Sequence, residues 1–203
     1  MKIGLYFGTF NPIHVGHLII ANYMAQYTDL DRVWMVVTPQ NPLKKNHNLL
    51  EDYHRLALVR IAVEDNHALD VTDIEFKLPK PSYTVNTLAA LGEKYPNYSF
   101  NLIMGEDNLR TLHKWRNHEH LIQNHHLYVY PRTLTEEEQA EINKDKQTSN
   151  QLFSHPNVKI VHAPVLRISS SLIRQAIKDK KDVRYLLTPA VHQYCVEMNF
   201  YKK

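Results

Sequence analysis

A pair of histidines directly after an apolar segment is the first group of residues that could do chemistry. The segment from Lys2 to Phe7 is short and apolar, as a buried strand is, and Gly8 is expected to let the backbone turn sharply. His14 and His17 are three residues apart, so they share a face if both lie in the first turn of a helix. The free amides and the dipole at a helix start attract anions. The pattern therefore predicts a phosphate site toward which both imidazoles donate.

A second group with phosphate-binding chemistry lies far along the chain, in the run from Ile168 to Arg174, I-S-S-S-L-I-R. Serines at a helix start often serve only as caps. However, Ser170 and Arg174 are one helical turn apart, so a hydroxyl, first-turn amides and a guanidinium converge on one point. A few charge-assisted hydrogen bonds, each worth about 1.5 to 3 kcal/mol, would hold a nucleotide there.

Both groups resemble known motifs. The run from Gly8 to His17, G-T-F-N-P-I-H-V-G-H, resembles the G-x-F-x-P-x-H-x-G-H motif of the nucleotidylyltransferase superfamily. That motif is related to the HIGH motif of class I aminoacyl-tRNA synthetases. The run from Ile168 to Arg174 resembles the C-terminal motif of nicotinate and nicotinamide mononucleotide adenylyltransferases, and the two motifs occur in that family's order.

Segments between the two motifs continue the resemblance. Asn41 to Lys44 (N-P-L-K) is similar to a loop that places a lysine over the active site, and Pro81 to Leu88 contains S-Y-T-x-x-T-L. Gly105 to Asp107, followed by Trp115, is similar to the family's G-x-D and tryptophan. Taken alone, each segment is also explained by a helix cap, a core tryptophan or a solvated lysine. Taken together, they make nearly the whole chain similar to the bacterial nicotinate-nucleotide adenylyltransferase family.

The resemblance implies a reaction and a set of ATP contacts. The 5'-phosphate of nicotinate mononucleotide would attack the α-phosphorus of ATP, which gives the dinucleotide and pyrophosphate. His17 would be the principal transition-state donor and His14 would hold a neighbouring oxygen, with the protonation state of His17 left open. Asp107 would accept from the ATP ribose, while Ser170 and Arg174 would hold the β and γ phosphates. The implied ATP-binding residues are Gly8, Thr9, Phe10, His14, His17, Gly105, Asp107, Ile168, Ser169, Ser170 and Arg174.

The implied residues that bind the mononucleotide substrate are Lys44, Ser82, Tyr83, Thr84, Trp115, Arg116 and Arg132, and Lys44 would approach the phosphates as a point charge. Trp115 would stack on the ring, and Thr84 with amides near Arg116 would hold its carboxylate, which favours nicotinate over nicotinamide. Mg²⁺ would bind through substrate phosphates, and no metal site within the protein is predicted. The chain departs from the family at Asn11, where members commonly carry aspartate.

Composition limits the class of protein. The chain has 203 residues and a net charge of +3, with lysine and arginine spread among the acidic residues, which disfavours a nucleic-acid partner. No apolar run is long enough to span a membrane, and the first residues lack a secretion signal. The single cysteine, Cys195, fits a reducing compartment. We therefore expect a cytoplasmic enzyme, formed by residues 1–203 as one domain, with a homo-oligomer left open.

Alternating patterns predict a Rossmann-like α/β fold, a doubly wound and mainly parallel sheet with flanking helices and a C-terminal helical segment. The expected strands are Lys2 to Phe7, Arg32 to Val37, Val71 to Ile74, Ser99 to Met104, Leu127 to Tyr130 and Val158 to Val161. The expected helices are Val15 to Tyr27, Leu50 to Val63, Val85 to Lys94, Asn108 to Lys114, Ser169 to Lys180, and one that begins at Pro189 after a Thr188 cap.

Other features leave alternatives open. The polar tract from Thr133 to Gln151 is read as an insertion with a short capped helix or, less favoured, as a lid, and residues 168–203 as a helical part. Five histidines between His113 and His126 lack a zinc-ligand pattern and are read as structural. The competing functions are transfer to nicotinamide mononucleotide or phosphopantetheine, a synthetase-like fragment that binds tRNA, and a nucleotide sensor without activity.

Overall fold

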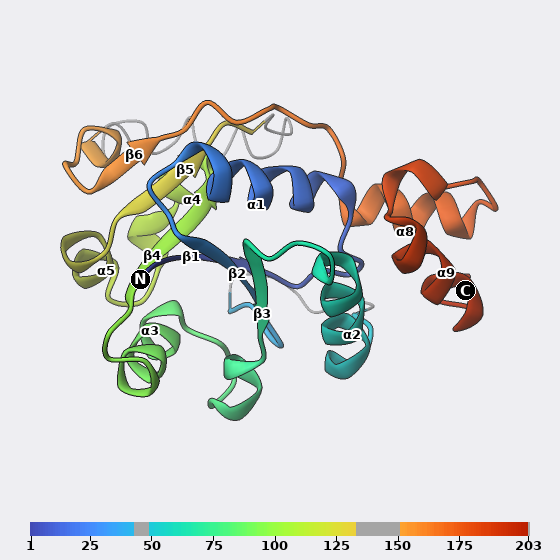
Figure 1. Ribbon diagram of the computed structural model, residues 1–203, viewed down its shortest axis with the longest axis horizontal. Helices are drawn as coiled ribbons and strands as arrows, with labels where there is room; N and C mark the ends of the chain where they lie inside the picture. The colour runs from blue at the N-terminus through green and yellow to red at the C-terminus, as the bar shows by residue number, and fades with distance from the viewer. Residues whose placement is uncertain (43–48, 133–150, 203) are drawn as a thin grey trace.

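The computed structural model describes residues 1–42, 49–132 and 151–202 and contains one sheet (Figure 1). Its six strands are all parallel and follow the order β3-β2-β1-β4-β5-β6, which confirms the predicted doubly wound fold. The strands are β1 (Lys2–Gly8), β2 (Arg32–Val37), β3 (Leu69–Thr72), β4 (Ser99–Gly105), β5 (Leu127–Tyr130) and β6 (Val158–Ile160).

Helices cover both faces of the sheet. The described helices are α1 (Val15–Tyr27), α2 (Asp52–Val63), α3 (Thr84–Lys94), α4 (Glu106–Arg110), α5 (His118–Asn124), α8 (Ser170–Lys178) and α9 (Pro189–Glu197). Residues of α1, α2, α8 and α9 pack in one apolar cluster, and residues of α3, α4 and α5 pack in a second one. No described helix meets the length and hydropathy that a bilayer crossing requires.

The strands are buried on both sides because their apolar residues alternate between the two clusters. In β2, Val33, Met35 and Val37 belong to the cluster with α1, whereas Trp34 and Val36 belong to the cluster with α3. A strand that is apolar on both faces is typical of the interior of a parallel sheet. This arrangement explains why an uninterrupted apolar run correctly predicted a central strand.

Several predicted boundaries need correction. The third strand is Leu69–Thr72 rather than Val71 to Ile74, because Ile74 begins a 3₁₀ turn, Ile74–Lys77. The helix expected at Asn108 begins at Glu106 and ends at Arg110, and a separate 3₁₀ turn, Leu112–Lys114, follows it. Helix α5 was not predicted, because its sequence H-E-H-L-I-Q-N buries only Leu121 and Ile122 and so shows little periodicity.

The strand order reverses between β1 and β4, which are neighbours although β2 and β3 lie between them in the chain. Loops that leave the carboxyl ends of two such strands diverge, and ligands of open α/β sheets bind in the crevice between them. The two strands end at Gly8, which begins the first predicted motif, and at Gly105, which begins the G-x-D segment. Lys44 and the tract 133–150, including the expected capped helix, lie outside the described residues.

Candidate active site

The loop from β1 to α1 carries the first predicted motif, and Phe10 within it has a left-handed backbone conformation. Phe10 has a positive φ of 45°, whereas the φ of Gly8 is not positive, so the expected turn at Gly8 is wrong. Gly8 is needed for space instead, because a Cβ there would lie 2.7 Å from the Phe10 ring. Phe10 is itself 2% exposed, and its ring packs against the imidazole of His17 at 5.1 Å between centroids.

His14 and His17 lie together as predicted, with their rings stacked at 3.7 Å between centroids. His14 is the N-cap of α1 rather than a residue of its first turn, and His17 is the third helical residue. The His14 N–H donates to Nδ1 of His17 at 3.3 Å, which leaves Nε2 of a neutral His17 as the donor. Tyr6 and Phe10 both make edge contacts with the His17 ring and thereby fix its orientation.

Burial lowers the pKa of His14 from 6.5 to about 4, because its ring is almost fully enclosed and a charged imidazole would lose its hydration. His14 is therefore neutral at pH 7 in the free protein. A neutral imidazole keeps one N–H donor for a phosphate oxygen.

This shift predicts a pH dependence of folding. Between pH 6.5 and pH 4 the unfolded chain takes up a proton at His14 that the folded chain does not, so stability falls as pH falls. We expect the free energy of unfolding to lose up to about 3 kcal/mol more in the parent protein than in a His14→Asn variant over this range. Urea unfolding of both proteins from pH 4 to pH 7 measures this difference. If the free energies of unfolding of the two proteins change with pH in parallel, the lowered pKa of His14 is contradicted.

The second predicted motif packs directly on the first. Ser170 Oγ donates to the carbonyl of Pro12 at 2.9 Å, and Arg174 Nη1 donates to the carbonyl of Asn11 at 2.8 Å. Ile168 packs at this junction too, because a Cβ on Gly16 would lie 3.6 Å from the Ile168 Cβ. The start of α8 therefore lies beside the loop from β1 to α1, as Figure 1 shows.

The serines of this motif have separate structural partners. Ser169 is the N-cap of α8 and accepts from the Leu172 N–H at 3.2 Å, so its hydroxyl serves the helix. Ser171 Oγ accepts from Arg174 Nη2 at 3.2 Å. Among the described residues, Ser170 is the serine of this motif whose hydroxyl hydrogen-bonds to the first motif. The capping interpretation thus applies to Ser169, whereas Ser170 joins α8 to the first motif.

Asp107 lies at the end of β4, in the first turn of α4. One carboxylate oxygen, Oδ2, contacts Arg132 Nη1 at 2.5 Å, and the other, Oδ1, is buried with no hydrogen-bond partner in the described part of the chain. Gly105 provides room for it, because a Cβ at Gly105 would lie 2.4 Å from Oδ1. Arg132, expected to bind the mononucleotide substrate, is thus paired with the residue expected at the ATP ribose.

The residues expected at the pyridine end come from two elements. Thr84 is the first residue of α3 and Tyr83 is its N-cap. The guanidinium of Arg116 lies over the Tyr83 ring, 5.0 Å from its centroid, so the loop after Trp115 meets the start of α3. Trp115 is partly buried against the apolar cluster that includes residues of α3, α4 and α5. Its indole Nε1 is buried without a partner in the described part of the chain.

Ser82 is directed toward the interior, toward Glu75. Glu75 is 2% exposed, and burial raises the pKa of its carboxyl. The Thr87 hydroxyl donates to Glu75 Oε1 at 2.7 Å, and the hydroxyls of Thr38 and Ser82 also lie close enough to lower this pKa. Ser82 therefore helps to join the start of α3 to the end of β2, where its N–H donates to Gln40.

Arg55 is a buried cation that sequence reasoning missed. It is 0% exposed, and its guanidinium donates to the carbonyls of Thr9 at 2.7 Å, Thr38 at 2.8 Å and Leu50 at 3.1 Å. A salt bridge to Asp52 at 2.5 Å completes its contacts. Arg55 thus joins the loops that follow β1 and β2 to the start of α2. The available signal was an arginine within the apolar face of α2.

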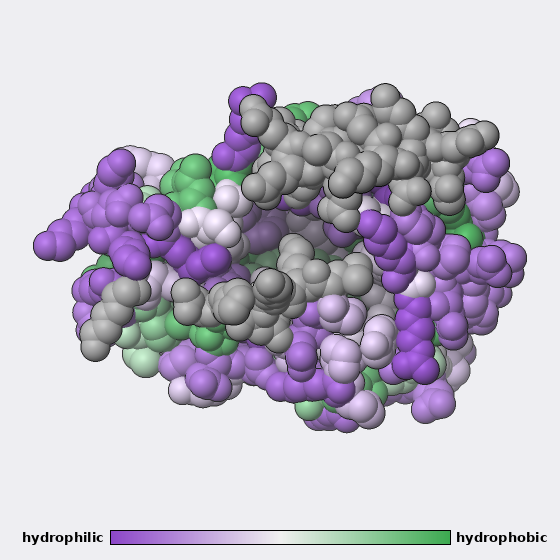
Figure 2. All heavy atoms as spheres, turned by 180° about the vertical axis from the view of Figure 1, so that it is seen from behind, coloured by the Kyte–Doolittle hydropathy of each residue, from purple (hydrophilic) through white to green (hydrophobic). Residues whose placement is uncertain are grey.

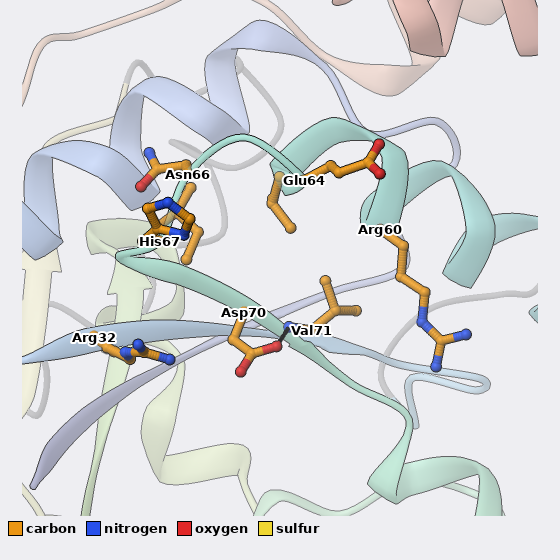
Figure 3. Close-up of a pocket in the computed structure, with 9 residues that line it drawn as sticks. Arg32, Arg60, Glu64, Asn66, His67, Asp70 and Val71 are labelled. Carbon is orange, nitrogen blue, oxygen red and sulfur yellow. Dashed lines mark hydrogen bonds between the residues drawn. The ribbon is translucent and has the colours of Figure 1, made fainter.

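A hollow of about 320 Å³ lies at the amino ends of β2 and β3, whereas the predicted motifs follow the carboxyl ends of the strands (Figure 3). Its lining includes Arg32 and Leu69, which begin β2 and β3, together with residues from the end of α2. Asp70 accepts from the N–H of Val71 at 2.7 Å there. None of the predicted motif residues lines this hollow.

The face turned away from the viewer in Figure 1 is hollowed near its centre, and the visible residues around this hollow are mostly hydrophilic (Figure 2). Among the described residues, no group of three or more histidine, cysteine, aspartate or glutamate side chains could hold a metal ion. The histidines between His113 and His126 form no such group, and their role stays a prediction.

Comparison with known proteins identifies relatives of this chain. A family model described as cytidylyltransferase-like matches residues 5–176. A protein of Flavobacterium psychrophilum named "Probable nicotinate-nucleotide adenylyltransferase" is 58% identical over 203 residues, which is 100% of both chains. A protein of the same name from Bacteroides thetaiotaomicron is 42% identical over 97% of this chain and 92% of its own length.

Solved structures show the same fold. The nicotinic acid mononucleotide adenylyltransferase of Plasmodium falciparum, described as complexed with NaAD, superposes with a TM-score of 0.76 at 21% identity, over 99% of this chain and 97% of the other. A putative nicotinate-nucleotide adenylyltransferase from Vibrio parahaemolyticus gives a TM-score of 0.71 at 20% identity, over 100% of this chain and 96% of the other. These likenesses support the sheet order described above.

Proposed function

The chain belongs to the cytidylyltransferase-like family, and we propose that it acts there as a nicotinate-nucleotide adenylyltransferase. The reaction joins ATP and nicotinate mononucleotide into nicotinate adenine dinucleotide and releases pyrophosphate, a step of NAD biosynthesis. The curated relatives carry this name at identities of 58% over their full length, which makes a common reaction the simplest reading.

One observation carries the proposal, namely the contact between the two phosphate motifs. Arg174 and Ser170 donate to Asn11 and Pro12, in the same loop that ends in His14. The two motifs therefore adjoin in the fold although they lie far apart in the sequence, and their imidazole, guanidinium and helix-start amides belong to one region. A triphosphate is the ligand that needs donors on several sides at once.

The reaction needs no side-chain nucleophile, because the substrate brings its own phosphate oxygen. An oxygen of the mononucleotide phosphate forms a bond to the α-phosphorus of ATP, and the bond from that phosphorus to the bridging oxygen of pyrophosphate breaks. The enzyme must align the two polyanions and stabilise the charge that builds on the α and β phosphates. We assign His17 Nε2 as the hydrogen-bond donor to the phosphate oxygens on which this charge builds. The neutral His14 would donate to a neighbouring oxygen.

Asp107 is assigned to the ATP ribose. Its buried Oδ1 has no partner in the described part of the chain, so it is able to accept from a ribose hydroxyl. Mg²⁺ is expected to arrive with the nucleotide and to be held by phosphate oxygens, since the donors around the two motifs are imidazole, guanidinium and hydroxyl groups. When bound, it would offset phosphate charge.

For the pyridine end, we assign the start of α3 and the segment from Trp115 to Arg116. Thr84 and the first amides of α3 would donate to a carboxylate, and the partly exposed Trp115 would stack on the ring. The aromatic and cationic side chains of Tyr83 and Arg116 already meet there at 5.0 Å. Lys44 is assigned to the phosphates by resemblance alone.

The activity is tested by release of pyrophosphate. Purified protein is incubated with ATP, Mg²⁺ and one acceptor at a time, namely nicotinate mononucleotide, nicotinamide mononucleotide or phosphopantetheine. We expect release with the first acceptor and formation of the corresponding dinucleotide, identified by mass. Efficient release with phosphopantetheine alone would overturn the proposal, and no release with any acceptor would favour a sensor.

Substrate selectivity gives a further prediction. A site built from donors leaves one donor facing the amide NH₂ of a nicotinamide group, and such an unpaired contact is costly when buried. We therefore expect kcat/KM for nicotinate mononucleotide to exceed that for nicotinamide mononucleotide by about 10² or more. Comparable efficiency on the two acceptors would refute the assigned donor set.

A further inference from the structure

Asn11, the departure from the family pattern, makes contacts that reach beyond its own loop. Its side chain is 1% exposed, and its amide oxygen accepts two hydrogen bonds. The Leu50 N–H donates one at 3.1 Å, and the hydroxyl of Tyr201 donates the other at 2.9 Å. The loop that leads to His14 is therefore attached to a residue 190 positions along the chain.

Tyr201 is held in an unusual backbone conformation. Its φ is 62°, and Asn199 two residues earlier has a φ of 55°, so both are left-handed although neither is glycine. Such conformations persist only where surrounding contacts impose them. Between the two, Phe200 is buried against the ring of His54 at 4.7 Å between centroids. The packed Phe200 thus fixes the direction in which the Tyr201 hydroxyl points.

Tyr201 also lies close to the cations of the site. Burial raises the pKa of its hydroxyl, while Arg174 and Arg55 lower it by a smaller amount, so the hydroxyl is protonated at neutral pH and donates. Arg174 reaches the same loop through the carbonyl of Asn11. Asn11 is therefore held through its side chain by Tyr201 and through its backbone by Arg174.

We propose that Tyr201 is a positioning residue for nucleotide transfer, because its hydroxyl fixes Asn11 and so holds the loop between Phe10 and His14 in the shape that receives the triphosphate. Tyr201 acts through Asn11 and is not assigned to the substrate. This inference rests on the proposed function, since it takes the loop to be the ATP phosphate site.

The test is Tyr201→Phe, which removes the hydroxyl and keeps the ring. We expect KM for ATP to rise about 3- to 10-fold, the scale of one lost hydrogen bond, while KM for nicotinate mononucleotide stays within a factor of two. The affinity for ATP with Mg²⁺, measured by calorimetry without any pyridine substrate, should fall by a similar factor. That measurement does not depend on turnover, so it tests Tyr201 even if the proposed reaction fails.

Tyr194→Phe is the matched control. Tyr194 lies on α9, and its hydroxyl bonds to Nδ1 of His54 at 3.0 Å without contacting the loop from β1 to α1. Both variants lose one partly buried hydrogen bond near the same end of the chain. A merely structural role would make the two variants alike in melting temperature and in ATP affinity, and this outcome would overturn the proposal.

A double variant separates the route through Asn11 from other routes. If Tyr201 acts through Asn11, then Tyr201→Phe should change ATP affinity by less than a factor of two in an Asn11→Ala background. Equal effects in both backgrounds would overturn this coupling. An unchanged ATP affinity for Tyr201→Phe in the parent background would overturn the proposal as a whole.

Discussion

Replacing His17 by alanine should lower kcat by about 10² to 10⁴, which is the usual scale for losing one donor that acts in the transition state. The reason is geometric as well as chemical. Nδ1 of His17 accepts from the His14 N–H, and the Tyr6 and Phe10 rings hold the imidazole from its edges, so Nε2 is prepared to donate without rearrangement. The kinetics of pyrophosphate release under saturating substrates measure the effect.

Two further variants make this result interpretable. His17→Gln places an amide N–H near the position of Nε2, so it should recover part of the lost turnover. His120→Ala changes an exposed histidine of α5 and should leave kcat unaltered. Melting temperatures of all variants should lie close to that of the parent protein. Turnover of His17→Ala within a factor of two of the parent would remove His17 from the assigned role.

The parts of the site that the sequence predicted are those in which chemistry and local structure coincide. His14 and His17 stand beside a strand end and a helix start, and both elements were evident from apolar patterns. Ser170 and Arg174 are likewise one turn apart on α8. Local spacing sufficed because each motif lies at one helix start. The contact between the two motifs is different, because it joins α8, which follows the edge strand β6, to the loop after β1.

What the sequence did not predict depends on contacts between distant backbone segments. Arg55 donates to the carbonyls of Thr9 and Thr38, and no pattern in one sequence pairs a side chain with carbonyls so far away. The left-handed turn fell on Phe10 rather than on Gly8 for a related reason. The buried surroundings of the Phe10 ring impose its conformation, whereas intrinsic preference alone would have chosen the glycine.

Asp107 and Arg132 illustrate a third limit. The resemblance assigned Asp107 to ATP and Arg132 to the other substrate, yet they form an ion pair across the ends of β4 and β5. Residues assigned one by one from motifs carry no information about their partners in the folded chain. Arg132 therefore lies beside the residue that we assign to the ribose, and its role in binding the mononucleotide stays a prediction.

Replacing Arg55 by methionine should lower the free energy of unfolding by about 3 to 5 kcal/mol, the range for breaking a buried ionic contact from one side. Methionine fills a similar volume, but the carbonyls of Thr9, Thr38 and Leu50 lose a buried donor together. Two of these carbonyls follow β1 and β2, so ATP affinity should fall as well. Urea unfolding and calorimetry with ATP and Mg²⁺ measure the two effects.

Arg60→Met is the matched control, because Arg60 lies on the same helix, is exposed and lines the hollow that contains none of the motif residues (Figure 3). It should change the free energy of unfolding by about 0.5 kcal/mol or less. Arg55→Lys keeps the charge but offers no planar fork to several carbonyls, so its loss should lie between those of the other two variants. If Arg55→Met unfolds at the same urea concentration as Arg60→Met, then the contacts of Arg55 do not hold the loops together. If it is destabilised but binds ATP as the parent does, the shape of the phosphate loop does not depend on Arg55.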